Sequence, residues 1–340
     1  MTAADGVAAI LVLALTLYSW SGLADYGAGF WDFFSGTREA GREPRKLIDA
    51  AVTPVWEANH VWLIFIFVVA WTGFGVAFAS IMTTLFIPLS LAALGVVLRG
   101  ASFALRKDAA LAGRRHLAGW LFGLGSFITP FFFGAALGGI AAGRVPVGNA
   151  AGHEITSWWN PVSVTAGLIA VSMGAFLAAV YLIAESRRRG LSGLEDHFRV
   201  RAVGAGIFAL AAGIGCAIAL YSDNRQMFDR FVQRGIPLLV IGVLALALAF
   251  FLTRRGTVRG LRVVSVVGVA ALIWAWAFSQ APYLLPFTLT INGGAGAEPT
   301  LQWLLVWSGI AFLLIVPALT LLYTLDQRTT DLGEDPLTSR

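Results

Sequence analysis

The sequence predicts an all-α integral membrane protein, and three observations support this fold class. Hydrophobic residues make up 58% of the 340-residue chain and charged residues only 13%, whereas a soluble domain carries about 25% charged residues. Uncharged segments long enough to cross a bilayer recur along the chain. Lys and Arg gather in alternate connections between these segments, as expected when one side of a membrane retains the positive charge. The net charge of +5 therefore reflects topology, and no nucleic-acid partner is needed to explain it.

The longest uncharged segment helps to set the number of spans. No charged residue occurs between Val61 and Leu98, a stretch of 38 positions. As a single helix this stretch would measure about 57 Å, almost twice the ~30 Å hydrocarbon core of a bilayer. Two spans joined by a tight turn near Phe78 to Ile81 are therefore predicted. Nine spans are predicted in all, each a helix because lipid offers the backbone no hydrogen-bond partner: 7–26, 57–78, 81–104, 117–142, 161–184, 202–221, 236–253, 263–280 and 301–324.

The positive charges define an orientation for these spans. With the N-terminus outside and the C-terminus in the cytoplasm, 19 of the 24 Lys and Arg residues lie on the cytoplasmic side and four on the outer side. The remaining one, Arg99, lies within a span. The connections are short and lack Pro-rich or Ser-rich linkers, so residues 1–340 are predicted to form a single polytopic membrane domain.

Two later spans carry recognisable packing and interface patterns. In the sixth span, small residues recur at a spacing that favours close helix contact: Gly204, Gly206, Gly213 and Gly215. The stretch from Trp274 to Pro286 combines aromatic residues with two prolines, which predicts an interfacial belt at the outer end of the eighth span. Contact with a partner subunit or with a quinone ring is the alternative interpretation of this stretch.

Ionisable side chains are costly within membrane spans and therefore mark candidate functional sites. Asp25, Glu57 and Arg99 occur near the cytoplasmic ends of the first three predicted spans. Two carboxylates and a guanidinium can form a buried charge cluster, or they can take up protons from the cytoplasm, because carboxyl groups exchange protons. Structural roles stay open as well, since Glu57 suits the positive end of a helix and Arg99 can extend to the membrane interface.

His60 lies three residues after Glu57 and so shares its helix face. It could extend a proton path or ligate a haem, although a hydrogen-bonded structural role is the simpler interpretation. Met82 and Met173 are the only methionines in the spans, and both lie near the outer side, which argues against haem ligation by this chain. No Cys and His spacing typical of a metal site, phosphate-binding loop or nucleophile triad occurs.

At these residues the sequence resembles subunit II of the cytochrome bd family of quinol oxidases. The resemblance covers essentially the whole chain and rests on four blocks in matching order: residues 18–29, 54–63, 98–103 and 276–286. It implies nine helices, arranged as two four-helix bundles plus one peripheral helix. It also implies a haem-free chain that pairs with a haem-bearing subunit I and contributes a proton path from the cytoplasm. A structural quinone and small single-span subunits are further expectations from the family.

The resemblance assigns roles to particular residues. Glu57 matches a position that is Asp in many members, within a Trp-Asp-Gly-Asn version of the block, and Asp25 matches the family's acid at the end of the first helix. Gly22 stands where many members carry a further acid, and His60 replaces a Glu found in part of the family. The implied proton path therefore comprises Glu57 and Asp25 as acids, Arg99 as the group that tunes them, and Asn59 as a polar positioning residue, with His60 beside them.

The predicted function is that of the haem-free second subunit of a respiratory quinol:oxygen oxidoreductase in a bacterial cytoplasmic membrane. No catalytic or metal-binding residue is expected in this chain. A proton-coupled transporter is one alternative, which would require interrupted helices and polar groups at the bilayer midplane. A structural paralogue without an oxidase partner is another. A haem-bearing subunit encoded beside this chain would distinguish the first hypothesis from the last.

Overall fold

The computed structural model describes residues 2–35, 41–52, 56–107, 115–255 and 260–331, and this part of the chain is almost entirely helical. The helices are α1 (Ala3–Phe34), α2 (Arg42–Val52), α3 (Trp56–Gly73), α4 (Gly75–Thr84), α5 (Phe86–Lys107), α6 (Arg115–Ala141), α7 (Pro161–Arg188), α8 (Ser192–Asp223), α9 (Arg225–Arg230), the π-helical turn η3 (Phe231–Gly235), α10 (Ile236–Arg255), α11 (Leu261–Gln280) and α12 (Glu298–Asp331). Two short strands, β1 (Tyr283–Leu285) and β2 (Leu289–Thr290), pair as an antiparallel hairpin. The all-helical class predicted for the chain is confirmed.

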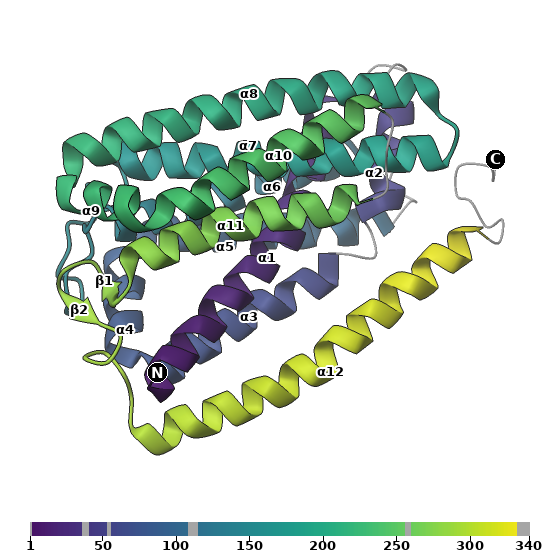
Figure 1. Cartoon of the computed structure of the whole chain (residues 1–340). Coiled ribbons are helices and arrows are strands. Elements are labelled where there is room, and N and C mark those ends of the chain that lie inside the picture. Colours follow the sequence, from purple (N-terminus) through teal and green to yellow (C-terminus); the bar gives the residue numbers. More distant parts are fainter. Residues whose placement is uncertain (1, 36–40, 53–55, 108–114, 256–259, 332–340) are drawn as a thin grey trace.

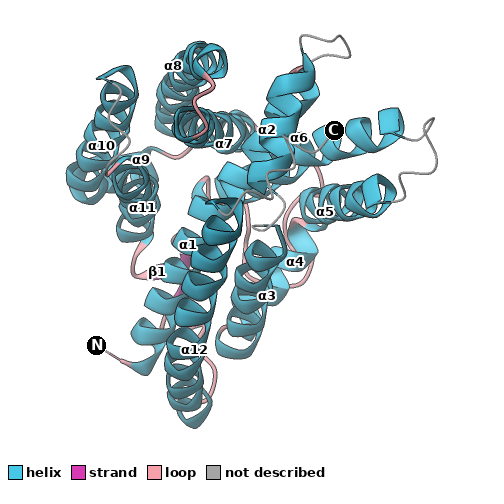
Figure 2. Ribbon diagram, turned by 90° about the vertical axis from the view of Figure 1, so that its right-hand side faces the viewer, coloured by secondary structure: helices cyan, strands magenta, loops and turns pink. Residues whose placement is uncertain are grey.

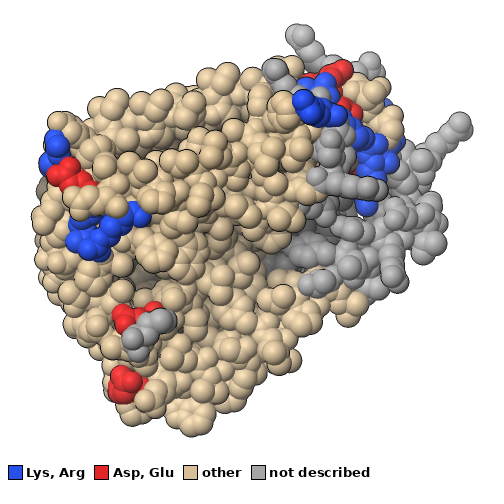
Figure 3. Space-filling view, viewed as in Figure 1, with Lys and Arg blue, Asp and Glu red and all other residues tan. Residues whose placement is uncertain are grey.

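Seven helical segments in the described part of the chain are long and apolar enough to cross a membrane by themselves. They are α1, α6, α7, α8, the continuous segment from α9 to α10, α11 and α12. An eighth candidate is the pair α4 and α5, which is bent by 83° at the junction, and α3 is a shorter apolar helix. Charged atoms gather at two ends of the molecule, with a broad uncharged region between them (Figure 3).

The turn predicted near Phe78 to Ile81 is wrong, because these residues lie inside α4. The chain instead breaks at Phe74, whose ring is buried and which is flanked by Gly73 and Gly75. A second break follows at Leu85. Pro88 explains it, because proline has no N–H to bond the carbonyl group four residues earlier and its ring disfavours a continuous helix there.

Helix α1 lies at the centre of the arrangement and contacts α3, α6, α7, α11 and α12 (Figures 1 and 2). Helix α7 contributes nine of the 19 buried residues of the largest cluster, more than any other helix, and has a nearly continuous buried run from Val171 to Ile183. The backbones of α1 and α7 approach closely where Gly27 faces Gly174. Because neither residue has a side chain, the two helices can touch along their main chains.

Helix α12 lies along one side of the molecule, where its main contacts are with α1 and α3 (Figure 2). Only 11% of its most apolar window is buried within the chain, so most of its surface is available to lipid or to a partner. The start of α1 and the end of α12 lie at opposite ends of the molecule (Figure 1).

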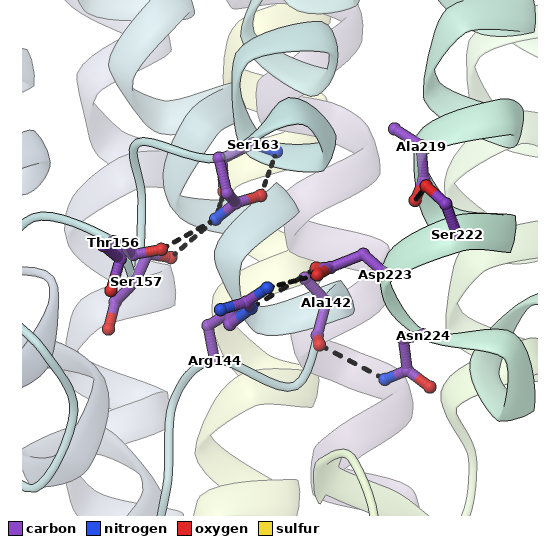
Figure 4. A network of polar contacts seen from close by, with 10 residues as sticks. Ala142, Arg144, Thr156, Ser157, Ser163, Ala219, Ser222, Asp223 and Asn224 are labelled. Atoms are coloured by element: carbon purple, nitrogen blue, oxygen red, sulfur yellow. Dashed lines mark hydrogen bonds and ion pairs between the residues drawn. The ribbon is translucent and has the colours of Figure 1, made fainter.

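The connections at the end that carries the hairpin are held by polar contacts (Figure 4). Nε of Arg144 donates to Oδ2 of Asp223 at 3.3 Å, and the Asn224 amide donates to the carbonyl group of Ala142 at 3.2 Å. Asn160 caps α7 by accepting a hydrogen bond from the Ser163 N–H group. The stretch from Trp274 to Pro286, which the sequence predicts as an aromatic belt, forms the end of α11 and the first strand of the hairpin.

Candidate functional site

The candidate site is a buried ion pair between α1 and α5. Nη2 of Arg99 donates to Oδ1 of Asp25 at 2.6 Å, and both side chains are at most 2% exposed. At about 1.5 Å per residue, Asp25 lies roughly 33 Å from the start of α1 and about 14 Å from its end. Arg99 is likewise nearer the end of α5 than its start. Asp25 and Arg99, two of the predicted site residues, are thus brought together near one end of the bundle.

Three further residues complete the surroundings of the Arg99 guanidinium. Its Nη1 donates to the hydroxyl group of Ser126 on α6, which in turn donates to the carbonyl group of Phe122. The ring of Tyr26 lies 4.7 Å from the guanidinium carbon and the ring of Phe122 lies 4.6 Å from it. A cation enclosed by two rings and bonded to a carboxylate is stabilised by cation–π attraction and by a charge-assisted hydrogen bond.

Glycines on α1 and α6 make the space for this arginine. A Cβ atom on Gly29 would lie 2.0 Å from the Ser126 hydroxyl oxygen and 2.9 Å from Nη1 of Arg99. A Cβ atom on Gly125 would lie 2.5 Å from the carbonyl oxygen of Gly95 on α5. The long guanidinium side chain therefore fits only because these two positions carry no side chain.

Helix α3 supplies the other predicted residues. The buried Asn59 amide donates to the carbonyl group of Ser21 on α1 at 3.4 Å, and both Asn59 and His60 lie close enough to Asp25 to act on its carboxylate. Glu57 lies in the first turn of α3, but its side chain is outside the described part of the chain. The structure thus brings Asp25, Arg99 and Asn59 together, and it places His60 and Glu57 on the same helix as Asn59.

Tyr26 connects the ion pair to an apolar cavity of about 430 Å³. Its hydroxyl group lies 3.2 Å from that of Tyr18, one of which donates to the other, and both tyrosines line the cavity. Apolar side chains from α1, α3, α4, α6, α7 and α11 form almost all of the remaining wall. The cavity can hold a long apolar molecule, with the two phenol groups as its polar contacts. Within the described residues, no cluster of three or more His, Cys, Asp or Glu side chains could hold a metal ion.

The site residues predicted from the sequence do not include Ser126, Tyr26 or Phe122. Tyr26 directly follows Asp25, but aromatic residues are so common in this chain that its position carried no distinct signal. Ser126 follows Gly-Leu-Gly within a span, and that pairing of a hydroxyl group with glycines at a helix contact was the one available clue.

These features define a polytopic helical membrane protein with a buried acid–base pair near one end of its bundle. The chain belongs to the family described as cytochrome bd terminal oxidase subunit II, whose sequence model matches residues 4–326.

Individual relatives agree with this assignment. The chain is 27% identical over 242 residues to cytochrome bd ubiquinol oxidase subunit 2 of Bacillus subtilis, which covers 68% of this chain and 66% of that protein. It is 27% identical over 217 residues to cytochrome bd-I ubiquinol oxidase subunit 2 of Escherichia coli K12, covering 57% of this chain and 50% of that protein. The matches thus span between half and two thirds of the length of these curated relatives.

Among solved structures, a chain of the bd oxidase from Geobacillus thermodenitrificans has a similar fold. The TM-score is 0.79 at 24% sequence identity, over 96% of this chain and 98% of that chain.

Proposed function

We propose that this chain is the haem-free subunit II of a cytochrome bd-type quinol:oxygen oxidoreductase, a terminal oxidase of aerobic respiration. In the complex, a haem-bearing subunit I would oxidise quinol and reduce oxygen to water, and small single-span subunits can join it. The curated relatives are named as ubiquinol oxidase subunits, which supports this activity. The observation that carries the proposal for this chain is the buried Asp25–Arg99 pair, set near one end of an otherwise apolar bundle.

The proposed topology has nine membrane helices in a single domain, with the N-terminus outside and the C-terminus in the cytoplasm of a bacterial inner membrane. An odd number of spans agrees with the positions of the start of α1 and the end of α12 at opposite ends of the molecule (Figure 1). The two four-helix bundles would leave α12 as the peripheral helix, which fits its low burial. The ion pair would then lie toward the cytoplasmic side.

In this topology the site would supply protons to the partner's oxygen-reducing centre. Glu57 and Asp25 would exchange protons, while Arg99 would hold Asp25 in place and favour its ionised form by charge. Asn59 and His60 would orient the carboxylate or a water molecule, because Asn59 bonds the carbonyl group of Ser21, one helical turn before Asp25, and His60 follows Asn59 on α3. The chain itself would carry out no redox step.

The apolar cavity fits the isoprenoid part of a structural quinone. Its wall is apolar apart from the tyrosines and a few small polar groups, and a volume of about 430 Å³ lies in the range of small-molecule sites. The phenol groups of Tyr18 and Tyr26 would provide hydrogen bonds to a ring carbonyl group. A bound quinone would contribute an apolar body that fills the space between α1, α3 and α7.

Purification through a tag on this chain tests the proposal as a whole. We expect a haem-containing membrane partner to co-purify, and the complex to consume oxygen when quinol is added. The chain produced alone should bind no haem, as judged by its visible absorption spectrum. A preparation without a haem-bearing partner, or one without quinol-dependent oxygen uptake, would contradict the assignment.

Replacing the proposed proton-exchanging acids should slow turnover. We expect Asp25→Asn and Glu57→Gln each to lower quinol-dependent oxygen uptake by about a hundredfold, the lower end of the range for a lost proton-transfer group. Turnover is compared per assembled complex, because Asp25→Asn also leaves the buried Arg99 without its charged partner and should lower the yield. The haem spectrum of the complex that assembles should be unchanged, because the haems would lie in the partner. Asp32→Asn is a matched control, since Asp32 is a buried acid on the same helix, 3.5 Å from Nε of Arg45. Equal turnover in all three variants and the parent complex would remove both acids from the path.

A further inference from the structure

Two arginines converge at the end of the molecule that carries the hairpin. Nε of Arg230 donates to the carbonyl group of Ser279 at 3.0 Å, and its Nη2 donates to that of Ala281. Nη1 of Arg234 donates to the same Ala281 carbonyl group at 2.9 Å. Arg230 directly precedes the π-helical turn η3 and Arg234 lies within it, and π-helical turns of this kind occur frequently at functional sites. The two guanidinium groups therefore lie side by side at the end of α11.

The charge of this pair is largely uncompensated. Of the four arginines that the structure describes at this end, Arg144 pairs with Asp223 and Arg225 pairs with Asp229. Within the described residues, Arg230 and Arg234 contact only carbonyl oxygens and, for Arg230, the rings of Tyr283 and Phe287. A helix C-terminus offers about half of one negative charge, so more than one positive charge remains. Arg234 is exposed, and basic atoms form a patch at this end in Figure 3.

An apolar surface begins directly beside the pair. Helix α10 continues from η3 along the uncharged region, and it exposes Ile236, Val240 and Leu244 at intervals of four residues, which places them on one face. Phe278 on α11 is 51% exposed one residue before the carbonyl group that Arg230 contacts. A cationic pair above a continuous apolar stripe matches the two parts of a membrane lipid, an anionic headgroup and acyl chains.

We propose that Arg230 and Arg234 bind the phosphodiester of an anionic phospholipid whose acyl chains lie along α10. Guanidinium groups bind phosphate oxygens by paired, charge-assisted hydrogen bonds. Arg230 is held by the end of α11 and by two rings, so it is fixed in place before the lipid binds. Arg234 is exposed, and its bond to the Ala281 carbonyl group uses only Nη1, so other N–H groups of the guanidinium can donate to a phosphate. Under the proposed orientation this lipid belongs to the outer leaflet.

Native mass spectrometry of the delipidated complex, with dimyristoyl phosphatidylglycerol added back, tests this site. We expect Arg234→Gln to weaken retention of this lipid by about tenfold, the loss of roughly one charge-assisted hydrogen bond. Lipid retention by the Arg234→Lys complex should lie between that of the parent and that of Arg234→Gln, because lysine retains the charge but lacks the planar guanidinium fork. Arg225→Gln is the matched control: Arg225 lies on the same helical segment but is paired with Asp229, so lipid retention should be unchanged. Dimyristoyl phosphatidylcholine should not replace phosphatidylglycerol in the parent complex.

Three outcomes would overturn the lipid site. Equal retention of phosphatidylglycerol by the Arg234→Gln and Arg225→Gln complexes would show that the pair does not bind it. Displacement of the lipid by millimolar inorganic phosphate would identify a site for a free anion. Loss of the partner subunit from the Arg234→Gln complex would show that the guanidinium pairs with a carboxylate of that partner. The thermal midpoint of each variant, measured alongside, verifies that the complex remains folded.

Discussion

Arg99→Leu is expected to prevent stable assembly of the protein. The substitution would leave the Asp25 carboxylate buried and without the guanidinium that now lies 2.6 Å away. Removing one partner of a buried ion pair costs about 3 to 5 kcal/mol, because the remaining charge is neither hydrated nor neutralised. The loss also empties the space between the rings of Tyr26 and Phe122. We expect a lower yield of the purified complex and a large drop in its thermal midpoint, followed by tryptophan fluorescence.

The double variant Asp25→Asn with Arg99→Gln separates stability from function. It removes both charges and keeps two side chains that can hydrogen bond, so most of the lost thermal stability should return. Turnover should remain low, because the proposed path would still lack Asp25. If the Arg99→Leu complex had the same thermal midpoint as the parent, the conclusion that Asp25 and Arg99 form a buried, stabilising pair would be wrong. Full turnover in the double variant would instead show that the pair is only structural.

The location of this site could be predicted from the sequence because charge is rare within the spans. Asp25 and Arg99 are separated by 74 positions in the sequence. Because a single charged side chain is costly to bury within a membrane span, each of them is expected to lie near a partner of opposite charge. The ring contacts of Arg99 could not be predicted in this way. Tyr26 and Phe122 act through the faces of their rings, and one aromatic residue among the many in the chain gives no sign of the cation it covers.

The course of the helices was less predictable than their class. Hydropathy alone identified an apolar region after Glu57 but placed the turn within α4, since glycine and proline positions decide where such a region bends. The small-residue pattern of the sixth span was confirmed at two of its four glycines. A Cβ added to Gly206 or Gly215 on α8 would meet a side chain of α7, whereas one added to Gly204 or Gly213 would meet nothing within 4 Å. Closer backbone contacts occur on other helices, for example at Gly27. Helix contacts depend on which face meets a neighbour, and spacing within one helix does not reveal this.

Gly27→Ala is expected to disrupt the contact between α1 and α7. An added Cβ would lie 1.9 Å from the carbonyl oxygen of Gly174 and 2.2 Å from its carbonyl carbon. Overpacking costs about 1 to 3 kcal/mol and occasionally more, and here the obstacle is backbone, which cannot rotate away. Relief requires α1 to move from α7, and Asp25 lies only two residues from the substitution. We therefore expect a loss of thermal stability near the upper end of this range, together with lower turnover of the fraction that assembles.

Gly22→Ala on the same helix is the matched control for this prediction. The nearest atom to its added Cβ is Cε2 of Tyr18 at 3.4 Å, an ordinary contact with a side chain that can adjust. Replacing glycine by alanine also favours a helix by up to about 1 kcal/mol, so this variant should be at least as stable as the parent. The two substitutions are chemically identical and five residues apart, and they differ in what the new methyl group meets. Similar thermal midpoints for both would therefore mean that α1 and α7 do not meet at Gly27 and Gly174.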